Sequence, residues 1–474
     1  MDEQTGTATD LEPGSFRDPD SRVVRSDGRI FRVLSERGLE DWRAFSATPL
    51  FAQLVEEGKL VGTSEADGLE LGETGLHGPV AGVLEHDVVP FVSYPYEWTF
   101  GMLRAAALLQ LELVRRSIEA GWMLKDSSPY NVQFVGSRPV FVDVGSFEPL
   151  REGEPWAGYR QFCMLFLYPL MLHAWKDVPF QPRLRGSIDG ITPAEARNLL
   201  SLSGRDLFHR GVLTDVVLHN RLERRYAGST SDVKGELKRA GFKKELIVAN
   251  VGRLERLVSR LRPQRSDSTW SDYGLTTTYT EEDAERKRRF VADAVKTESP
   301  RLVWDVGANE GQHSRDAAEI AEYVVAMDAD AVVVDRLYGE LAEQRSERIL
   351  PLVVNVVDPS PGLGWRGTER QPLPERGRPD LTLCLAVLHH VSISGNVPVA
   401  SFLDWLRDLG GATVIEFPTP EDPMVARLLA RKREHDHPDY RRDWFEQCLE
   451  ERFDVLESIE LGEGTRFIYR ARPR

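Results

Sequence analysis

The amino-acid sequence predicts an α/β protein in which a doubly wound, mostly parallel sheet of seven strands follows an α+β module. Two observations lead to this fold class. After residue 301, short apolar segments alternate with helical patterns, which is typical of a parallel sheet covered by helices. Before residue 262, helix-like and strand-like segments are mixed, which predicts an α+β module. The chain of 474 residues also exceeds the roughly 150 residues of one typical domain, so more than one domain is expected.

The first part of the chain is expected to hold a loosely ordered arm and one α+β module. Residues 1–29 are rich in Asp, Arg, Ser, Gly and Thr and show no periodicity, so we expect a loosely ordered N-terminal arm. The module, residues 30–265, begins with a strand-like segment at 30–34 and has a β-rich stretch at 80–96. Residues 100–121 place apolar side chains at helical spacing and end at a glycine suited to a helix C-cap.

Two short strands and several helices are expected in the rest of the module. The strands lie at residues 131–134 and 139–142, and the turn-forming pair Gly136-Ser137 separates them. Helical patterns follow at 159–174, 193–202 and 232–261. The polar segment RPQRSDS then interrupts the periodicity and carries a proline, so we place the domain boundary there and a second domain at residues 268–474.

Seven apolar segments predict the strands of the second domain. Five are expected to run parallel, and the two closely spaced segments at the C-terminus predict an antiparallel hairpin at the edge of the sheet. In chain order the segments are RLVWDV, EYVVAM, ILPLVVNV, DLTLCLAV, ATVIEF, FDVLESIEL and TRFIYRARP.

Composition excludes several classes of protein. The 60 basic and 75 acidic residues give a net charge of −15, so attraction to a nucleic-acid backbone or an anionic membrane has no support and nucleic acid is an unexpected partner. The three cysteines form no CxxC pair, which predicts neither a disulfide framework nor a zinc site, and we expect no metal. The polar N-terminus resembles no signal peptide, and the longest apolar run is too short to span a bilayer, so we expect a cytoplasmic location.

A glycine-containing turn after the first strand of the second domain predicts a cofactor site. Asp305, Gly307 and Gly311 form the pattern D-x-G-x-x-x-G at a strand-to-helix turn, and ligands of open α/β sheets bind beyond the carboxyl ends of the strands. The spacing differs from the G-x-G-x-x-G of nicotinamide and flavin sites, which disfavours a dinucleotide reductase. The next strand ends at Asp328, whose carboxylate can accept hydrogen bonds from two ribose hydroxyls, with Asp330 as the alternative.

This ordered set resembles the class I S-adenosylmethionine-dependent methyltransferases over about residues 268–474. The resemblance implies S-adenosyl-L-methionine as the cofactor, held by the DVGANEG turn with Asp305 near its amino end and Asp328 on the ribose. Asn355 stands where the family places a residue that reads the adenine edge, and Asp358 competes for that role.

Aromatic residues before the first strand stand where such enzymes close over the cofactor. They are Trp270, Tyr273 and Tyr279, and of these Tyr273 or Tyr279 could stabilise the sulfonium by cation–π attraction. The alternative is that these aromatic side chains pack at the domain junction.

Three residues are candidates for acid–base chemistry. A hydroxyl or ammonium acceptor needs a base, and His389 or His390 lies on the loop after the fourth strand; capping of the strand is the alternative role. Glu416 ends the fifth strand and is a further candidate, with a structural salt bridge as its alternative. The segments TWSDY, NVVDPSPGLGW, LAVLHH and VIEF also resemble a group of two-part bacterial methyltransferases, some of them nodulation-related.

A second group of residues in the first domain resembles a phosphotransferase loop. Asp126 and Asn131 have the spacing D-x-x-x-x-N, and Asp143 opens a D-x-G after a hairpin; in protein kinases the Asn and the second Asp hold Mg²⁺. Residues 85–265 therefore resemble a degenerate protein-kinase or aminoglycoside-phosphotransferase fold. The glycine-rich loop, the V-A-I-K lysine and the H-R-D histidine are absent, and an ordinary tight turn would also contain these residue types.

The sequence thus predicts a two-domain enzyme that transfers a methyl group from S-adenosylmethionine to an unidentified acceptor. The N-terminal module would recruit or present the substrate. Two alternatives remain: a Mg-ATP-dependent phosphotransferase that uses Asp126, Asn131 and Asp143, and a non-catalytic protein that binds S-adenosylmethionine. Neither the acceptor nor the oligomeric state follows from the sequence.

Overall fold

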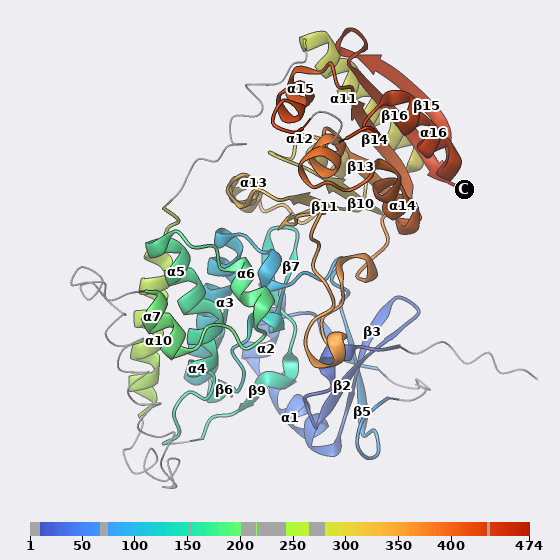
Figure 1. Ribbon diagram of the computed structural model, residues 1–474. Helices are drawn as coiled ribbons and strands as arrows, with labels where there is room; N and C mark the ends of the chain where they lie inside the picture. Colours follow the sequence, from blue (N-terminus) through green and yellow to red (C-terminus); the bar gives the residue numbers. More distant parts are fainter. Residues whose placement is uncertain are drawn as a thin grey trace, which may run out of the picture. The chain divides into compact units, whose positions relative to one another are not determined.

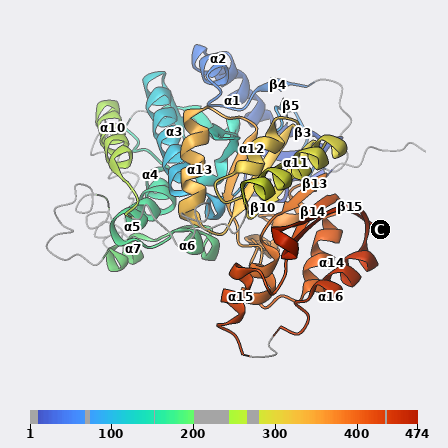
Figure 2. The same cartoon turned by 90° about the horizontal axis from the view of Figure 1, so that it is seen from above.

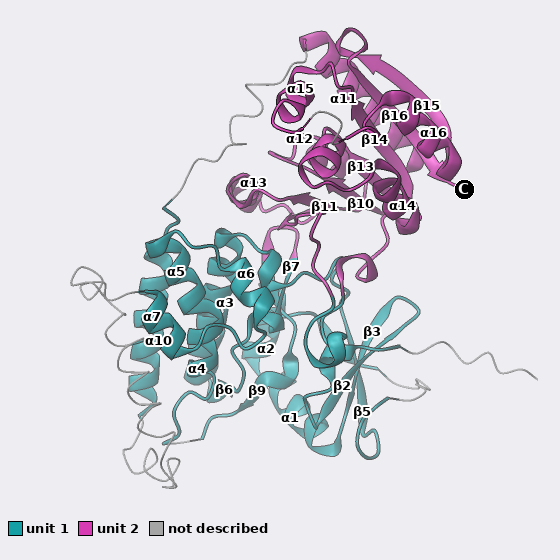
Figure 3. Cartoon of the chain, viewed as in Figure 1, with its two compact units in different colours: residues 1–134, 139–264, 362–371 teal, residues 135–138, 265–361, 372–474 magenta. Residues whose placement is uncertain are grey.

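The computed structural model describes residues 10–66, 74–151, 153–200, 215, 243–264, 280–433 and 437–474. The chain forms two compact units (Figure 3), each of which includes a short segment from the other half of the sequence. Unit 1 comprises Met1–Phe134, Pro139–Gln264 and Gly362–Gln371, and unit 2 comprises Val135–Arg138, Arg265–Pro361 and Pro372–Arg474. The main division therefore lies between Gln264 and Arg265.

An antiparallel sheet of five strands, in the order β1-β2-β3-β5-β4, occupies the N-terminal part of unit 1 (Figure 1). Its strands are β1 (Asp10–Leu11), β2 (Ser21–Ser26), β3 (Arg29–Leu34), β4 (Thr63–Glu65) and β5 (Gly82–His86).

The prediction of a loosely ordered arm at residues 1–29 is wrong for its second half. Strand β2 pairs with β3 along its whole length, and Val24 is fully buried. The segment SRVVRS contains only two apolar residues, so strand periodicity is too short to recognise without the pairing partner. The region 80–96, expected to be rich in strand, contains only β5.

Helices form most of the rest of unit 1. They are α1 (Glu36–Ser46), α2 (Pro49–Glu56), α3 (Phe100–Glu119), α4 (Tyr159–Phe162), the π-helical turn η5 (Cys163–Leu167), α5 (Tyr168–Lys176), α6 (Gln181–Gly186), α7 (Pro193–Leu199) and α10 (Lys244–Arg260). Thr99 caps α3 by accepting a hydrogen bond from the backbone of Met102, and the helix packs against α10. The predicted helix at 100–121 is confirmed. Within the described ranges, no helix combines the length and apolar character that a bilayer crossing requires.

Short strands follow α3 in unit 1. Strand β6 (Trp122–Leu124) pairs with β9 (Phe147–Pro149), and β7 (Val132–Val135) pairs with β8 (Arg138–Phe141). The predicted hairpin is therefore confirmed, and the loop that carries Asp126 and Asn131 connects β6 to β7.

A seven-stranded sheet in the order β12-β11-β10-β13-β14-β16-β15 forms unit 2. The strands β10 to β14 are parallel and β16 runs antiparallel between β14 and β15, as the sequence predicts. Their bounds are β10 (Leu302–Val306), β11 (Tyr323–Asp328), β12 (Ile349–Val353), β13 (Leu381–Cys384), β14 (Ala412–Pro418), β15 (Phe453–Leu461) and β16 (Arg466–Pro473).

Helices cover both faces of this sheet. Figure 2 shows α11 (Glu281–Glu298), α12 (Gln312–Ala318) and α13 (Ala331–Glu343) on one side and α14 (Val399–Leu409) and α16 (Arg442–Arg452) on the other. The short helix α15 (Pro423–Leu429) follows β14. On one face, the core contains apolar residues of the sheet and of α11, α12 and α13. Successive residues of the central strands are buried, so both faces are covered and the strand sequences read as continuous apolar runs.

Each exchanged segment is held by polar contacts within its unit. In unit 2, the backbone N–H of Gly136 donates to Tyr323 Oη at 2.9 Å, and that of Ser137 donates to the carbonyl of Ser346 at 2.8 Å. In unit 1, the segment Gly362–Gln371 comes from the connection between β12 and β13, and the backbone N–H of Gln371 donates to Tyr94 Oη at 3.0 Å. The sequence analysis anticipated neither exchange.

Candidate functional site

A cavity of about 760 Å³ lies at the carboxyl ends of β10, β11, β12 and β13 in unit 2. This volume lies within the usual range of small-molecule pockets, and the position is where open α/β sheets bind ligands. Five residues that the sequence analysis named line the cavity: Gly307, Asp328, its alternative Asp330, Asn355 and His390.

The turn after β10 requires its first glycine. Gly307 has φ +79°, and a Cβ built there would lie 2.1 Å from Val387 Cγ2. Its backbone N–H donates to the carbonyl of Met327 at 2.8 Å, which ties the turn to the end of β11. Gly311 begins α12 with φ +75°, and a Cβ there would meet Leu337 of α13 at 2.8 Å. Gly307 therefore shapes the cavity wall, whereas Gly311 allows close helix packing.

Asn309 is a cavity residue that the sequence analysis missed. It has φ +48°, and its backbone N–H donates to Asp328 Oδ2 at 3.0 Å. Its side-chain Oδ1 is buried and has no hydrogen-bond partner in the protein. A buried acceptor without a partner at a cavity wall indicates a place for a ligand donor. The available signal was an asparagine in a glycine-flanked turn, where left-handed backbone is common.

The structure separates the roles of Asp328 and Asp330. Asp328 lines the cavity at the end of β11, and its two oxygens accept the backbone N–H groups of Asn309 and Asp330, at 3.0 and 2.9 Å. Burial raises the pKa of Asp328. Asp330 also lines the cavity, and it caps α13 because its Oδ1 accepts the N–H of Val332 at 2.9 Å. Both carboxylates therefore lie at the cavity, and Asp330 has a helix-capping role as well.

Asp305 lies beneath the turn and is not one of the cavity-lining residues. It is 2% exposed, and its Oδ2 accepts a hydrogen bond from Ser314 Oγ of α12 at 2.5 Å. Burial raises its pKa to about 6, against the hydrogen bond from Ser314, which lowers it. Its predicted place near the amino end of a cofactor stays a prediction.

Of the two candidates after β12, only Asn355 lines the cavity. Its Oδ1 accepts the backbone N–H of Val357 at 3.1 Å, which fixes the side chain beside the wall. The backbone N–H of Asp358 donates to the carbonyl of Asn355 at 2.9 Å. The structure therefore favours Asn355 over Asp358 as the residue facing a ligand.

Of the two histidines after β13, His390 lines the cavity. Burial lowers its pKa to about 4. His389 is fully buried behind it, with the two ring centroids 4.0 Å apart, and neither of its ring nitrogens has a hydrogen-bond partner. Burial lowers the pKa of His389 as well, so both imidazoles are neutral near pH 7.

Glu416 takes part in a buried ionic cluster. Its carboxylate accepts Lys287 Nζ of α11 at 2.7 Å and Arg466 Nη1 of β16 at 2.8 Å, and Arg466 also pairs with Asp422 at 2.7 Å. Glu416 is fully buried and is not one of the cavity-lining residues. These contacts favour its alternative role, a structural salt bridge. No local pattern marked Lys287 or Arg466, because their partners lie 129 and 50 residues away in the sequence.

Trp270, Tyr273 and Tyr279, predicted to close over the cofactor, lie outside the described residues. Their roles stay predictions.

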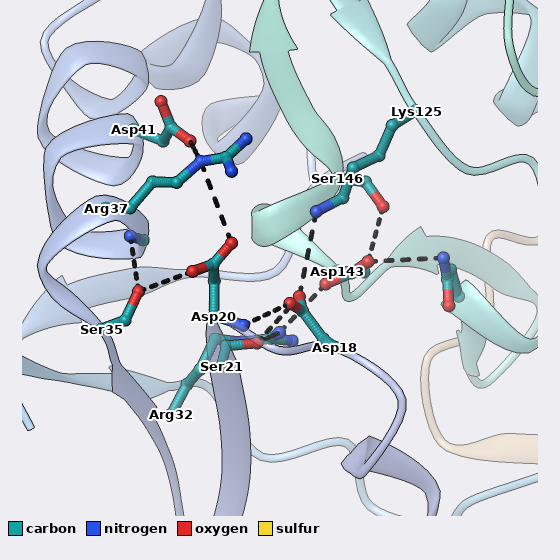
Figure 4. A network of polar contacts seen from close by, with 12 residues as sticks. Asp18, Asp20, Ser21, Arg32, Ser35, Arg37, Asp41, Lys125, Asp143 and Ser146 are labelled. Atoms are coloured by element: carbon teal, nitrogen blue, oxygen red, sulfur yellow. Dashed lines mark hydrogen bonds and ion pairs between the residues drawn. The ribbon is translucent and has the colours of Figure 1, made fainter. Parts of the chain in front are cut away.

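The second predicted group, in unit 1, is brought together around Asp143. Arg32 Nη1 lies 3.0 Å from Asp143 Oδ1, and Ser146 Oγ donates to Oδ2 at 2.5 Å (Figure 4). The side-chain amide of Asn131 lies 3.4 Å from the same Oδ2. Burial and the nearby charge of Asp143 raise the pKa of Asp126. Among the described residues, no group of three or more His, Cys, Asp and Glu side chains has an arrangement that could hold a metal ion.

Solved structures that match part of this chain include methyltransferases. The N-methyltransferase NodS from Bradyrhizobium japonicum WM9 is 11% identical, with 41% of this chain and 97% of NodS covered and a TM-score of 0.30. Its complex with S-adenosyl-L-homocysteine matches with a TM-score of 0.31 over 43% of this chain and 96% of NodS, at 11% identity. Magnesium protoporphyrin IX methyltransferase (ChlM) from Synechocystis PCC 6803, with the same ligand bound, is 15% identical over 40% of this chain and 84% of ChlM, with a TM-score of 0.28. Because these sequence identities and TM-scores are low, the matches do not indicate the substrate of this chain.

Comparison with protein-family profiles finds no match. Among curated proteins, nodulation protein NoeA from Rhizobium meliloti (strain 1021) is 34% identical over 462 residues, which cover 96% of this chain and 94% of NoeA. Because the similarity spans both units, the chain belongs to the family of nodulation protein NoeA.

Proposed function

We propose that unit 2 is an S-adenosylmethionine-dependent methyltransferase and that the N-terminal unit recruits or presents its acceptor. The observation that carries the proposal is the cavity at the carboxyl ends of β10 to β13, in which Asp328 and Asn309 offer acceptor oxygens to a ligand. The order of the seven strands, with β16 antiparallel between β14 and β15, supports it, because this is the sheet that the methyltransferase resemblance implies.

The polar atoms of the cavity suit this cofactor. S-adenosylmethionine carries ribose hydroxyls and an amino group, all hydrogen-bond donors. Asp328 presents a carboxylate held in place by two backbone N–H groups, and the buried Oδ1 of Asn309 has no partner within the protein. Asn355 also lines the cavity, after β12, and an amide side chain can pair with an adenine edge. Gly307 keeps the turn free of a Cβ at the cavity wall.

When bound, the cofactor supplies an already activated methyl group on a sulfonium. The protein has two tasks, to hold the acceptor in line and to manage its proton. His390 lies at the cavity wall and is neutral near pH 7, so a ring nitrogen can accept a hydrogen bond from an acceptor hydroxyl or amine. The buried His389 packs against the His390 ring and restricts its orientation.

Isothermal titration with S-adenosylhomocysteine tests the proposal through a matched pair of variants. Asp328→Asn removes one charge at the cavity, and Asp330→Asn makes the same chemical change at the second cavity carboxylate, which caps α13 and where asparagine is equally suitable as a cap. Loss of a charge-assisted hydrogen bond of about 1.5–3 kcal/mol weakens binding on the order of ten- to a hundred-fold for Asp328→Asn. Asp330→Asn should bind as the wild type does. Equal affinities for all three proteins, each folded by circular dichroism, would refute the assignment of Asp328.

A further inference from the structure

The loop constellation of unit 1 has no role in the proposed methyl transfer. In the phosphotransferase interpretation, Asn131 and Asp143 would hold Mg²⁺ and Asp126 would orient a hydroxyl. The structure brings these three residues together, but it gives the carboxylate of Asp143 other partners.

Both oxygens of Asp143 are engaged. Oδ1 pairs with the guanidinium of Arg32 at 3.0 Å, and Oδ2 accepts Ser146 Oγ at 2.5 Å and lies 3.4 Å from the Asn131 amide (Figure 4). The side chain of Asp143 is 17% exposed and that of Arg32 is 9% exposed. A carboxylate in this setting needs a positive charge close by, and Arg32 supplies it.

Arg32 is fixed from several directions. Its Nη1 donates to Ser21 Oγ at 3.1 Å, its Nε to His86 Nε2 at 3.3 Å, and its Nη2 to the carbonyl of Val142 at 3.5 Å. Burial and the charge of Arg32 lower the pKa of His86 to about 3, so the imidazole is neutral and can accept from Arg32. A guanidinium with this many partners is a fixed part of the site.

The loop between Asp126 and Asn131 is also covered. The guanidinium of Arg370 lies 4.3 Å from the ring centroid of Tyr130, within the segment Gly362–Gln371 that belongs to unit 1. Glu369 of the same segment accepts a two-point ion pair from Arg17 at 2.8 and 2.9 Å. The chain therefore places its own side chains on the loop where a phosphotransferase would receive a substrate.

We propose that the guanidinium of Arg32 takes the place of a divalent cation at Asp143, so that unit 1 is a metal-independent scaffold whose loop holds the segment Gly362–Gln371. Unit 1 then neither binds Mg²⁺ at Asp143 nor transfers phosphate. The proposal is independent of the methyltransferase assignment, because it concerns residues of unit 1 alone.

Titration of the full-length protein with Mn²⁺, followed by electron paramagnetic resonance of the free ion, is the first test. The wild type should show no saturable binding, with or without ATP. Saturable binding that Asp143→Asn abolishes would overturn the proposal. This measurement needs no variant that could fail to fold.

The second test removes the internal cation. Arg32→Met removes the main counter-charge of Asp143 and leaves only the weaker influence of Lys125, so we expect a lower melting temperature that MgCl₂ partly restores at constant ionic strength, and new Mn²⁺ binding. The double variant Arg32→Met/Asp143→Asn should lose the metal response. Arg29→Met, which removes an exposed arginine of the same strand paired with Glu85, is the matched control and should acquire none.

An Arg32→Met protein that folds and ignores both metals would contradict the proposal. If Arg32→Met does not fold, Arg32→Lys replaces it, since lysine keeps the charge but loses the multiple contacts of the guanidinium. Arg32→Lys should then show no Mn²⁺ binding, because a positive charge still faces Asp143, and saturable Mn²⁺ binding by a folded Arg32→Lys protein would overturn the assignment.

Discussion

The buried carboxylate of Asp305 should make unit 2 less stable as the pH rises. Its pKa in the folded protein is raised to about 6 from an ordinary value of 3.8, and burial is the main cause. Between these two pH values the folded state binds more protons than the unfolded state, so stability decreases as the pH rises through this window. Asp305→Asn removes the titrating group and should remove this dependence.

The magnitude follows from the difference in pKa. A difference of about 2 units corresponds to roughly 3 kcal/mol between pH values well below and well above the window. In the experimentally accessible range from about pH 5 to about pH 7.5, the same linkage gives a loss of roughly 1.4 kcal/mol for the wild type relative to Asp305→Asn. The absolute stability of the variant also depends on how well the new amide is paired, so the prediction concerns the pH dependence.

Urea unfolding of the wild type and of Asp305→Asn at the two pH values measures this quantity, with unfolding followed by tryptophan fluorescence and circular dichroism. Asp316→Asn is a suitable control, because pairing with Arg288 lowers the pKa of Asp316 and its titration lies below this range. Identical pH dependence in the wild type and Asp305→Asn would refute the reasoning.

Three further predictions concern contacts within unit 2. Gly307→Ala should lower the free energy of unfolding by roughly 1–2 kcal/mol because of its left-handed backbone, and by a further 1–3 kcal/mol, roughly, because the new Cβ meets Val387. In a double-mutant cycle measured by urea unfolding, Val387→Ala should relieve the clash with the new Cβ but not the backbone strain. Glu416→Gln leaves Lys287 and Arg466 without their shared carboxylate, and a loss of about 3–5 kcal/mol is expected in the same assay; a change below about 1 kcal/mol would contradict a structural role. Tyr323→Phe removes the acceptor of the Gly136 N–H and should lower stability by about 1–3 kcal/mol, and an unchanged melting temperature would show that the contact is replaceable.

Much of unit 2 could be predicted because its strands are local features. Each parallel strand is buried on both faces, so it appears in the sequence as an apolar run, and the order of runs and helices restricts the topology. The positions of Gly307 and Asp328 follow from the same logic, since both come directly after a strand. The sequence could not choose between Asp328 and Asp330, and the structure places both at the cavity, with Asp330 also capping α13.

Contacts between distant parts of the chain could not be predicted. The ion pairs of Glu416 join residues from α11, β14 and β16, and nothing in the segment that contains Lys287 distinguishes it from an exposed charged helix. Strand β2 is recognisable only beside β3. The exchanged segments Val135–Arg138 and Gly362–Gln371 likewise depend on single contacts such as Tyr323 with Gly136, which leave no periodic pattern.

Arg32 illustrates the same limit in unit 1. The sequence analysis sought a lysine in a V-A-I-K strand and found none, whereas the structure brings an arginine of β3 to Asp143 across 111 residues of sequence. The spacing of Asp126, Asn131 and Asp143 could be recognised in the sequence, but the ion pair between Asp143 and Arg32 could not.

The most direct test of the central claim is calorimetric titration of the wild-type protein with S-adenosylhomocysteine, NADH and Mg-ATP in separate experiments. The account predicts saturable binding of S-adenosylhomocysteine, at one site per chain, and none of the other two. Binding of Mg-ATP or NADH without binding of S-adenosylhomocysteine would contradict the account and reduce the methyltransferase assignment of unit 2 to a similarity of fold.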